Sequence, residues 1–201
     1  MANTYTWRPT DGLYFSSSGG SSGISNHVYY SSNRAFRMDF PDLGGLLGKA
    51  KSSLSIQSAV LTVYIMDAHS ATLTLGYNYK TAFADRKTML ASRAGIVMNS
   101  SAGWMDIDLT DVIKAYIKDG TSNTMRLWGY GTGGSSSNAR FRGINPSSSY
   151  TAQRPYLLLT YAAGSARIYT DGEWKTASPY VFYNGVWQPT TIKMRNNGSW
   201  N

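Results

Sequence analysis

The sequence contains no cysteine, which excludes disulfide bonds, thiolate metal ligands and cysteine nucleophiles. Acidic residues are scarce as well, with 11 Asp and Glu against 19 Lys and Arg, and Glu173 is the single glutamate. The two histidines, His27 and His69, lie far apart in loop-like sequence, where a histidine is more often solvated than catalytic. The chain has no nucleophile-elbow, P-loop or dinucleotide-binding pattern. The sequence therefore predicts a protein that is not an enzyme and carries no cofactor.

Long hydrophobic runs are also missing. No stretch approaches the roughly 20 apolar residues of a membrane-spanning helix, so we expect no membrane partner. The net charge is +8, but the basic residues are scattered, and the densest groups, 49–51 and 140–142, are short. Nucleic-acid binding needs a clustered basic face, so we expect no nucleic-acid partner. Anionic cell-wall polymers suit the same charge.

Alternation of apolar and polar residues, which is typical of half-buried strands, dominates the middle of the chain. Phe36, Met38 and Phe40 alternate with Arg37 and Asp39. Residues 59–66 form a continuous apolar run, which predicts a central strand buried on both faces. Further strands are expected at residues 72–79, 105–109, 125–130, 140–143 and 156–161. This spacing predicts an all-β fold, a jelly-roll-like β-sandwich over residues 1–162 whose first 33 residues are rich in loops.

One short helix interrupts the predicted strands. Thr110 is expected as its N-cap, with Asp111 in the first turn where a negative charge suits the helix dipole. Apolar residues at positions 112, 113, 116 and 117 then share a face, and Gly120 ends the helix. We expect this helix to close one end of the sandwich.

The last part of the chain, residues 163–201, repeats with a period of thirteen. Asp-Gly or Asn-Gly pairs, which favour two-residue type I′ hairpin turns, occur at 171–172, 184–185 and 197–198. A tryptophan follows two residues after each glycine, at Trp174, Trp187 and Trp200. The pattern predicts a small C-terminal β-meander of hairpins. Its tryptophans are candidate assembly or docking residues, because so small a sheet has little core of its own; a folded extension without a partner is the alternative.

Two sets of residues are candidates for chemistry or binding. Asp106 and Asp108 project from the same face of a predicted strand, as a catalytic carboxylate pair or a calcium site would require. A solvent-facing pair that leads into the helix cap explains them more simply, so we predict no catalytic and no metal-binding residues and leave calcium open.

The second set suits glycans, which stack on aromatic faces beside polar groups. Tyr77, Tyr79, Arg126, Trp128 and Tyr130 fall on strands expected to be neighbours, and they predict a glycan-binding platform. Packing of these aromatic rings in the core is the alternative interpretation.

Four segments, 37–40, 58–64, 104–112 and 154–161, resemble in order and spacing the carbohydrate-binding-like jelly-roll modules called DNRLRE or disaggregatase-related domains. The resemblance covers residues 34–161 and implies a β-sandwich that binds or displays rather than catalyses. The tail segments 171–175 and 184–189 are similar to short repeats at the ends of phage and prophage structural proteins. The tail similarity, together with the absence of a signal-like pattern at residues 1–5, implies a bacteriophage structural protein on the head or tail surface, as a fibre, tail-tip or decoration component that mediates attachment or host-surface contact.

This interpretation carries further expectations. The partners would be other virion proteins, further copies of the chain in a homo-oligomer and a bacterial cell-surface glycan. Residues 1–5 lack the basic-then-apolar pattern of a secretory signal, so we expect synthesis in the bacterial host cytoplasm and location in the virion. Two alternatives remain open: a carbohydrate-binding module of a secreted enzyme or adhesin, and a glycan depolymerase that uses Asp106 and Asp108.

Overall fold

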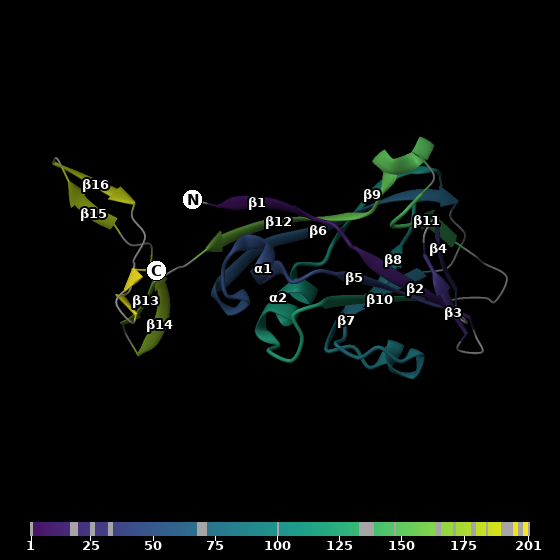
Figure 1. Ribbon diagram of the computed structural model, residues 1–201, viewed down its shortest axis with the longest axis horizontal. Helices are drawn as coiled ribbons and strands as arrows, with labels where there is room; N and C mark the ends of the chain where they lie inside the picture. The colour runs from purple at the N-terminus through teal and green to yellow at the C-terminus, as the bar shows by residue number, and fades with distance from the viewer. Residues whose placement is uncertain are drawn as a thin grey trace.

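The protein is a β-sandwich of two six-stranded antiparallel sheets, seen in the computed structural model of Figure 1. The structure describes residues 2–16, 20–24, 27–31, 34–67, 72–99, 101–132, 139–146, 148–163, 166–170, 172–177, 180–183, 185–189, 195–196 and 199–200. The predicted all-β sandwich is confirmed.

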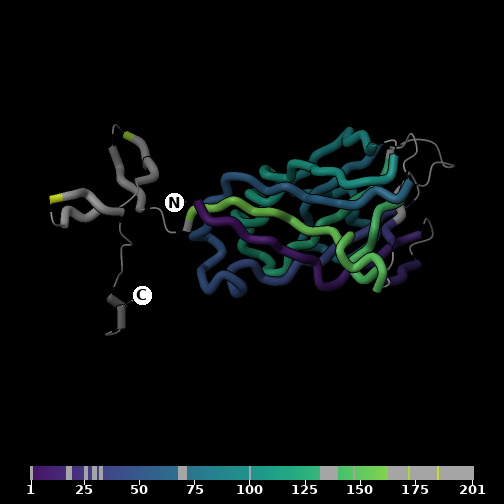
Figure 2. The backbone as a smooth tube through the Cα atoms, turned by 90° about the horizontal axis from the view of Figure 1, so that it is seen from above, coloured from purple at the N-terminus to yellow at the C-terminus, as the bar shows by residue number. Residues whose placement is uncertain are grey.

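The first sheet, sheet A, is organised around one long strand, β6 (Leu54–Asp67). On one side β6 pairs first with β12 (Tyr156–Ala163) and then, at its end, with β11 (Ala139–Arg142). β1 (Asn3–Trp7) extends the sheet beyond β12, and β4 (His27–Tyr30) extends it beyond β11. β9 (Gly103–Asp108) pairs with the other side of β6 and is an edge strand. Figure 2 shows β1, β12 and β6 side by side along one face of the molecule.

The second sheet, sheet B, has the strand order β3-β2-β5-β10-β7-β8. Its strands are β2 (Asp11–Phe15), β3 (Ser21–Gly23), β5 (Ala35–Phe40), β7 (Thr72–Tyr77), β8 (Ala91–Val97) and β10 (Met125–Thr132). β10 lies at its centre and pairs along its length with both β5 and β7.

The core lies between the sheets and follows the alternation seen in the sequence. Phe36, Met38 and Phe40 of β5 are fully buried, as are Leu75 and Tyr77 of β7. Sheet A contributes buried side chains of the same kind, namely Trp7, Ala59, Leu61, Val63, Ile65, Ile107, Leu157 and Leu159. The predicted inward residues of these strands are therefore confirmed, but β5 and β7 are buried at nearly every residue and not on one face alone. β6, predicted to be buried on both faces, keeps Val60 and Tyr64 partly exposed. β7 also ends at Tyr77, before Tyr79.

Helix α2 (Thr110–Lys118) buries the four apolar residues that the sequence placed on one face. Thr110 is its first residue and not its N-cap: the N-cap is Leu109, whose side chain cannot accept a hydrogen bond. The acceptor is Asp108, whose Oδ1 receives the Thr110 backbone N–H at 2.9 Å and the Thr110 hydroxyl at 2.6 Å. The Thr110 hydroxyl oxygen accepts in turn from the Ala59 backbone N–H at 3.0 Å, so α2 is tied directly to β6.

The sequence did not predict helix α1 (Leu43–Leu47). The Asp42 carboxylate accepts a hydrogen bond from Gly44 N at its start, and Gly48 ends it with a φ of 62°. Its helix propensity is low, because two of its five residues are glycine and glycine is a poor helix former. Three short 3₁₀ helices, η1 (Lys51–Ser53), η2 (Phe83–Lys87) and η3 (Ser148–Gln153), complete the sandwich.

The first 33 residues contribute strands to both sheets. β1 and β4 belong to sheet A, and β2 and β3 belong to sheet B. β3 consists only of serine and glycine and pairs with residues 13–15 of β2. Its strand conformation comes from the ladder that β2 offers and not from its own propensity, since glycine is depleted in strands.

The described part of the tail consists of hairpins. β13 (Ala166–Thr170) pairs with β14 (Glu173–Ala177), β15 (Tyr180–Tyr183) with β16 (Val186–Pro189), and β17 (Arg195–Asn196) with β18 (Ser199–Trp200). Gly172 and Gly185 have φ values of 79° and 78°, the left-handed conformation that the Asp-Gly and Asn-Gly turns predict. Each described pair forms its own two-stranded sheet, so these strands are separate hairpins where we expected one meander.

Candidate functional site

The aromatic platform predicted on sheet B is not available to a ligand as an exposed ladder. Tyr77 and Trp128 have no exposed surface. Tyr77 points into the core, where its hydroxyl donates to Asp119 Oδ2 at 2.5 Å and its ring meets Tyr116 edge-on with centroids 5.4 Å apart. The burial of Tyr77 raises the pKa of its hydroxyl far above the ordinary value, and the hydrogen bond to Asp119 acts in the same direction.

Trp128 lies on the outer side of sheet B but is covered by neighbouring residues. Phe15 stacks on it with centroids 5.2 Å apart, and Phe83 of η2 stacks on Phe15 at 5.6 Å. The Trp128 indole N–H donates to the Lys80 carbonyl at 3.2 Å, and the Arg37 guanidinium carbon lies 5.7 Å from the ring centroid. The segment that contains η2 is thus fastened over this face of the sheet.

The other three predicted platform residues are Tyr79, Arg126 and Tyr130. They are half-buried, and their contacts also help to hold the segment around η2 over sheet B. Arg126 donates to the Tyr79 carbonyl at 2.8 Å and to Ser122 Oγ at 3.2 Å. The Lys87 ammonium lies 5.6 Å from the Tyr130 ring centroid. The five residues therefore belong to one region of sheet B, and packing accounts for Tyr77 and Trp128, as the alternative interpretation expected.

A different aromatic cluster, in which Trp104 is exposed and Tyr64 and Tyr156 are half-buried, occurs on the outer face of sheet A. Trp104 of β9 is 46% exposed and lies opposite Tyr64 of β6 in the ladder. The two rings meet edge-to-face at 90° with centroids 5.4 Å apart. Tyr156 of β12, on the far side of β6, also lies near Trp104, with ring centroids 6.3 Å apart. We call Trp104, Tyr64 and Tyr156 the sheet A aromatic surface.

The sequence explains why these three side chains share a face. Successive residues of a strand point to opposite faces, and directly paired residues point to the same face. Trp104 pairs with Tyr64, and Tyr156 pairs with Thr62, two residues away on β6. Within β9, Trp104, Asp106 and Asp108 point to the outer face of the sheet, whereas the buried Ile107 points to the core. The period of residues 103–108 could therefore have identified Trp104 as an outward residue, although its partners come from strands distant in sequence.

Polar and charged groups surround the sheet A aromatic surface. Asp106 pairs with Thr62 and accepts its hydroxyl hydrogen bond at 2.6 Å. On the other side, the Arg8 guanidinium carbon lies 5.1 Å from the Tyr156 ring centroid. The surface thus combines flat aromatic rings with a carboxylate at one edge and a guanidinium at the other, the combination of stacking and hydrogen-bonding groups that sugar rings require.

The carboxylate pair Asp106 and Asp108 has structural contacts on both members. Asp108 accepts two hydrogen bonds from Thr110, and these hold the pKa of its carboxyl below the ordinary value. A general acid for glycoside hydrolysis needs a pKa shifted in the opposite direction. Within the described residues, no group of three or more His, Asp or Glu side chains is arranged to hold a metal ion.

The remaining predicted positions lie partly outside the described residues. The side chains of Trp174, Trp187 and Trp200 are not among those described, so their docking role stays a prediction. His69 is likewise outside the described residues. His27 belongs to β4, and its pKa is lowered by burial and by the nearby Arg140 and Arg142 guanidinium groups. In the described part of the chain, no helix has the length and apolar character needed to cross a membrane.

The fold and this surface define the protein as a β-sandwich with an exposed aromatic face. No protein-family model matches the sequence, and comparison with curated proteins finds no match. Among solved structures, the chain is similar to one described as the structure of infectious bursal disease virus Gx strain, with 12% identity and a TM-score of 0.24. The similarity covers 81% of this chain and 36% of that chain, so this protein spans about a third of the viral chain.

Proposed function

We propose that this protein is a non-enzymatic surface component of a bacteriophage particle, and that its sandwich binds a host-surface glycan through the sheet A aromatic surface. The observation that carries the glycan proposal is the 46% exposure of Trp104 beside two further aromatic rings. Large exposed side chains that form a contiguous surface are characteristic of interaction sites, whereas single exposed apolar residues are ordinary.

A glycan is the ligand that suits this surface best. Sugar rings present one apolar face that packs against aromatic rings and a rim of hydroxyl groups that bond to carboxylate, guanidinium and hydroxyl groups. Asp106 and Arg8 supply such groups beside the rings. The surface is an open face of a sheet, so it suits a chain that lies along it.

The particle assignment depends on the tail. The hairpin repeat supports it through its similarity to repeats of phage structural proteins, and in such a particle the tail would hold the protein to its neighbours while the sandwich faces outward. A carbohydrate-binding module of a secreted enzyme or adhesin would use the same aromatic surface. Mass spectrometry of purified phage particles separates the two, because only a virion component remains with the particles at constant stoichiometry.

Glycan binding is tested with the full chain on an array of bacterial cell-wall and capsular glycans, followed by titration of each glycan that is retained. We expect Trp104→Ala to weaken binding by at least about tenfold, as for other central aromatic contacts. Leu90→Ala is the matched control, because Leu90 is 55% exposed and precedes β8 in sheet B. Equal binding by wild type and Trp104→Ala would reject the sheet A aromatic surface as the binding site.

A further inference from the structure

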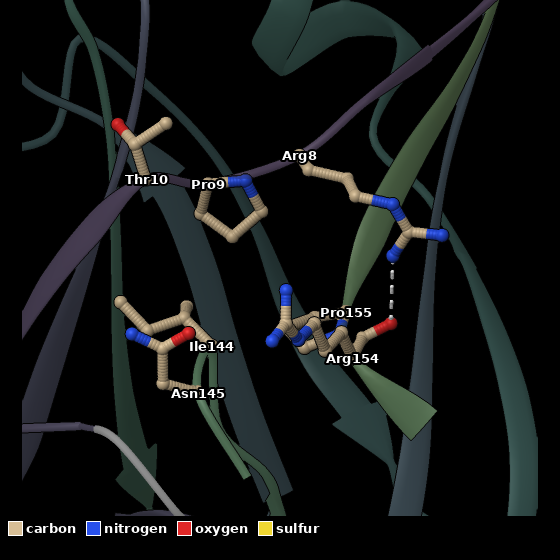
Figure 3. Close-up of a pocket in the computed structure, with 7 residues that line it drawn as sticks. All are labelled: Arg8, Pro9, Thr10, Ile144, Asn145, Arg154 and Pro155. Atoms are coloured by element: carbon tan, nitrogen blue, oxygen red, sulfur yellow. Dashed lines mark hydrogen bonds between the residues drawn. The ribbon is translucent and has the colours of Figure 1, made fainter. Parts of the chain in front are cut away.

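A cavity of about 290 Å³ opens beside the sheet A aromatic surface. Three separate segments form its wall: the connection from β1 to β2, the residues after β11, and the residues that lead from η3 into β12. The lining residues, shown in Figure 3, are Arg8, Pro9, Thr10, Ile144, Asn145, Arg154 and Pro155.

Hydrogen bonds hold each wall segment in place. Thr10 N donates to the Asp39 carbonyl at 3.0 Å, and Ile144 N donates to the Ile24 carbonyl at 3.1 Å. Arg8 Nη1 donates to the Arg154 carbonyl at 3.4 Å, which joins the first segment to the third. Pro9 and Pro155 restrict the backbone next to each arginine, since proline fixes φ. The cavity is therefore formed before any ligand arrives.

Both charged residues of the cavity are arginines, and among the described residues neither has a carboxylate within ion-pair distance. Arg154 Nε is buried and has no hydrogen-bond partner in the described part of the chain. Arg8 has one recorded hydrogen bond, although a guanidinium group carries five N–H donors. Figure 3 shows the Arg154 guanidinium inside the ring of lining residues, with Arg8 on one side and Ile144 and Asn145 on the other.

We propose that this cavity binds the anionic group of an acidic glycan, a carboxylate or a phosphate, whose sugar ring packs on the sheet A aromatic surface. The inference rests on the proposed function and names the class of glycan. Arginine guanidinium groups match both anions with paired N–H donors. Arg8 connects the two sites, because it lines the cavity and also lies 5.1 Å from the Tyr156 ring centroid.

The charges nearby favour a glycan over a nucleic acid. A nucleic acid carries one phosphate per nucleotide, and its backbone would pass the Asp106 and Asp108 carboxylates on the same face. A glycan with one anionic group per repeat can place that group at Arg8 and Arg154 and leave hydroxyl groups for Asp106. The overall charge of +8 assists the approach of either polymer, so the local arrangement decides.

The anion site is tested by NMR of the arginine Nε–Hε signals in the full chain, with sodium phosphate and sodium acetate as separate probes at constant ionic strength. We expect the Arg154 signal to shift saturably with at least one anion. The spectrum of Arg154→Gln, which lacks this signal, assigns it. Arg93 is the control signal, because its side chain is 50% exposed and already close to Asp108. Parallel, non-saturating shifts of Arg154 and Arg93 would indicate screening alone and overturn the proposal.

The glycan array provides the second arm, with neutral, uronic-acid and teichoic-acid glycans compared for wild type, Trp104→Ala and Arg154→Gln. We expect Arg154→Gln to weaken binding of the acidic glycans about tenfold or more. Equal binding of the acidic glycans by wild type and Arg154→Gln, together with loss of binding in Trp104→Ala, would overturn the anion site and leave the proposed function intact. Anion binding at Arg154 with no glycan affected by Trp104→Ala, or competition by an oligonucleotide, would overturn the glycan as the ligand.

Discussion

The rings of Trp104 and Tyr156 lie with centroids 6.3 Å apart although β6 separates their strands. Strands two places apart in a sheet are separated by roughly 9–10 Å, so at least one of the rings leans across β6. Thr62, the β6 residue paired with Tyr156, is short and engaged with Asp106, and it leaves room for the rings above it. Three strands thereby create one continuous aromatic surface.

The first prediction concerns Tyr156, which touches Trp104 on one side and Arg8 on the other. Tyr156→Ala should weaken glycan binding about tenfold and red-shift the tryptophan emission, because removal of the ring that borders Trp104 leaves that indole more exposed to water. Tyr156→Phe should retain most of the affinity, since the ring remains. Titration of the glycans found on the array, followed by tryptophan fluorescence, measures both effects. Equal loss in Tyr156→Phe would assign the effect to the hydroxyl group and not to stacking.

The second prediction concerns Arg37, which is 7% exposed and pairs with Asp39 through two hydrogen bonds of 2.7 and 2.8 Å. Its third recorded bond reaches the Thr81 carbonyl at 3.1 Å and holds the η2 segment over Trp128. Arg37→Ala should lower the free energy of unfolding by about 3–5 kcal/mol, because Asp39 is left buried without its partner. Denaturant unfolding measures the loss.

Arg93→Ala is the matched control for Arg37. Its pair with Asp108 is long, at 3.8 Å, and both side chains are at least half exposed. Exposed pairs contribute roughly 0–1 kcal/mol, so the variant should be nearly as stable as the wild type. Similar losses in Arg37→Ala and Arg93→Ala would contradict the structural role given to Arg37.

The third prediction concerns acid stability at the start of α2. Hydrogen bonds from Thr110 lower the pKa of Asp108, so the ionised carboxylate stabilises the folded state above the ordinary value of about 4. That contribution is lost as the pH falls through the lower pKa of the folded protein. Asp108→Ala should cost about 0.5–1 kcal/mol at pH 7, a modest value because the side chain is 62% exposed.

Denaturant unfolding of wild type and Asp108→Ala from pH 7 down to pH 2.5 checks this sign. The difference between the two proteins should shrink below about pH 4, because protonated Asp108 no longer accepts both hydrogen bonds. Asp111→Ala gives the comparison, since the Asp111 side chain is 97% exposed and acts on α2 only through its charge near the helix start. A difference that grows in acid would contradict the assignment.

The fourth prediction concerns Gly76 in β7. A Cβ at this position would lie 2.2 Å from Met89 Sδ and 2.5 Å from the Ala91 carbonyl oxygen, so backbone of the neighbouring β8 would have to move. Gly76→Ala should therefore destabilise the sandwich by about 1–3 kcal/mol. Gly120→Ala is the control, because a Cβ there meets nothing within 4 Å. Thermal unfolding of both variants gives the comparison, and an unchanged Gly76→Ala would show that β8 yields without cost.

The fifth prediction concerns the tail. Every described residue of the hydrophobic core lies between Trp7 and Tyr161, so a chain that ends at Ala163 should fold and bind glycans as the full chain does. If the tail mediates assembly, light scattering after size-exclusion chromatography should show an oligomer for the full chain and a monomer for the shortened chain. Monomers in both cases would contradict self-assembly through the hairpins and leave attachment to other virion proteins to be tested.

Much of the sandwich could be predicted because local periodicity states which side of a strand is buried. Phe36, Met38 and Phe40, or Ile107 between Asp106 and Asp108, show this alternation directly. The Gly172 and Gly185 turns were equally predictable, since the left-handed backbone is a local property. Strand β3, which consists of serine and glycine, was not predictable, because its strand conformation depends on its pairing with β2.

The sequence by itself determined an all-β chain, the phase of its long strands, the apolar face of α2 and the positions of the hairpin turns, because each depends on residues close in the chain. Only the tertiary structure decided which aromatic residues reach the surface. Trp128 and Trp104 both point outward from their sheets, yet η2 and Phe15 cover the first, while β9 lies at an open edge and leaves the second exposed. Exposure depends on what packs over a face, and that is set by segments distant in sequence.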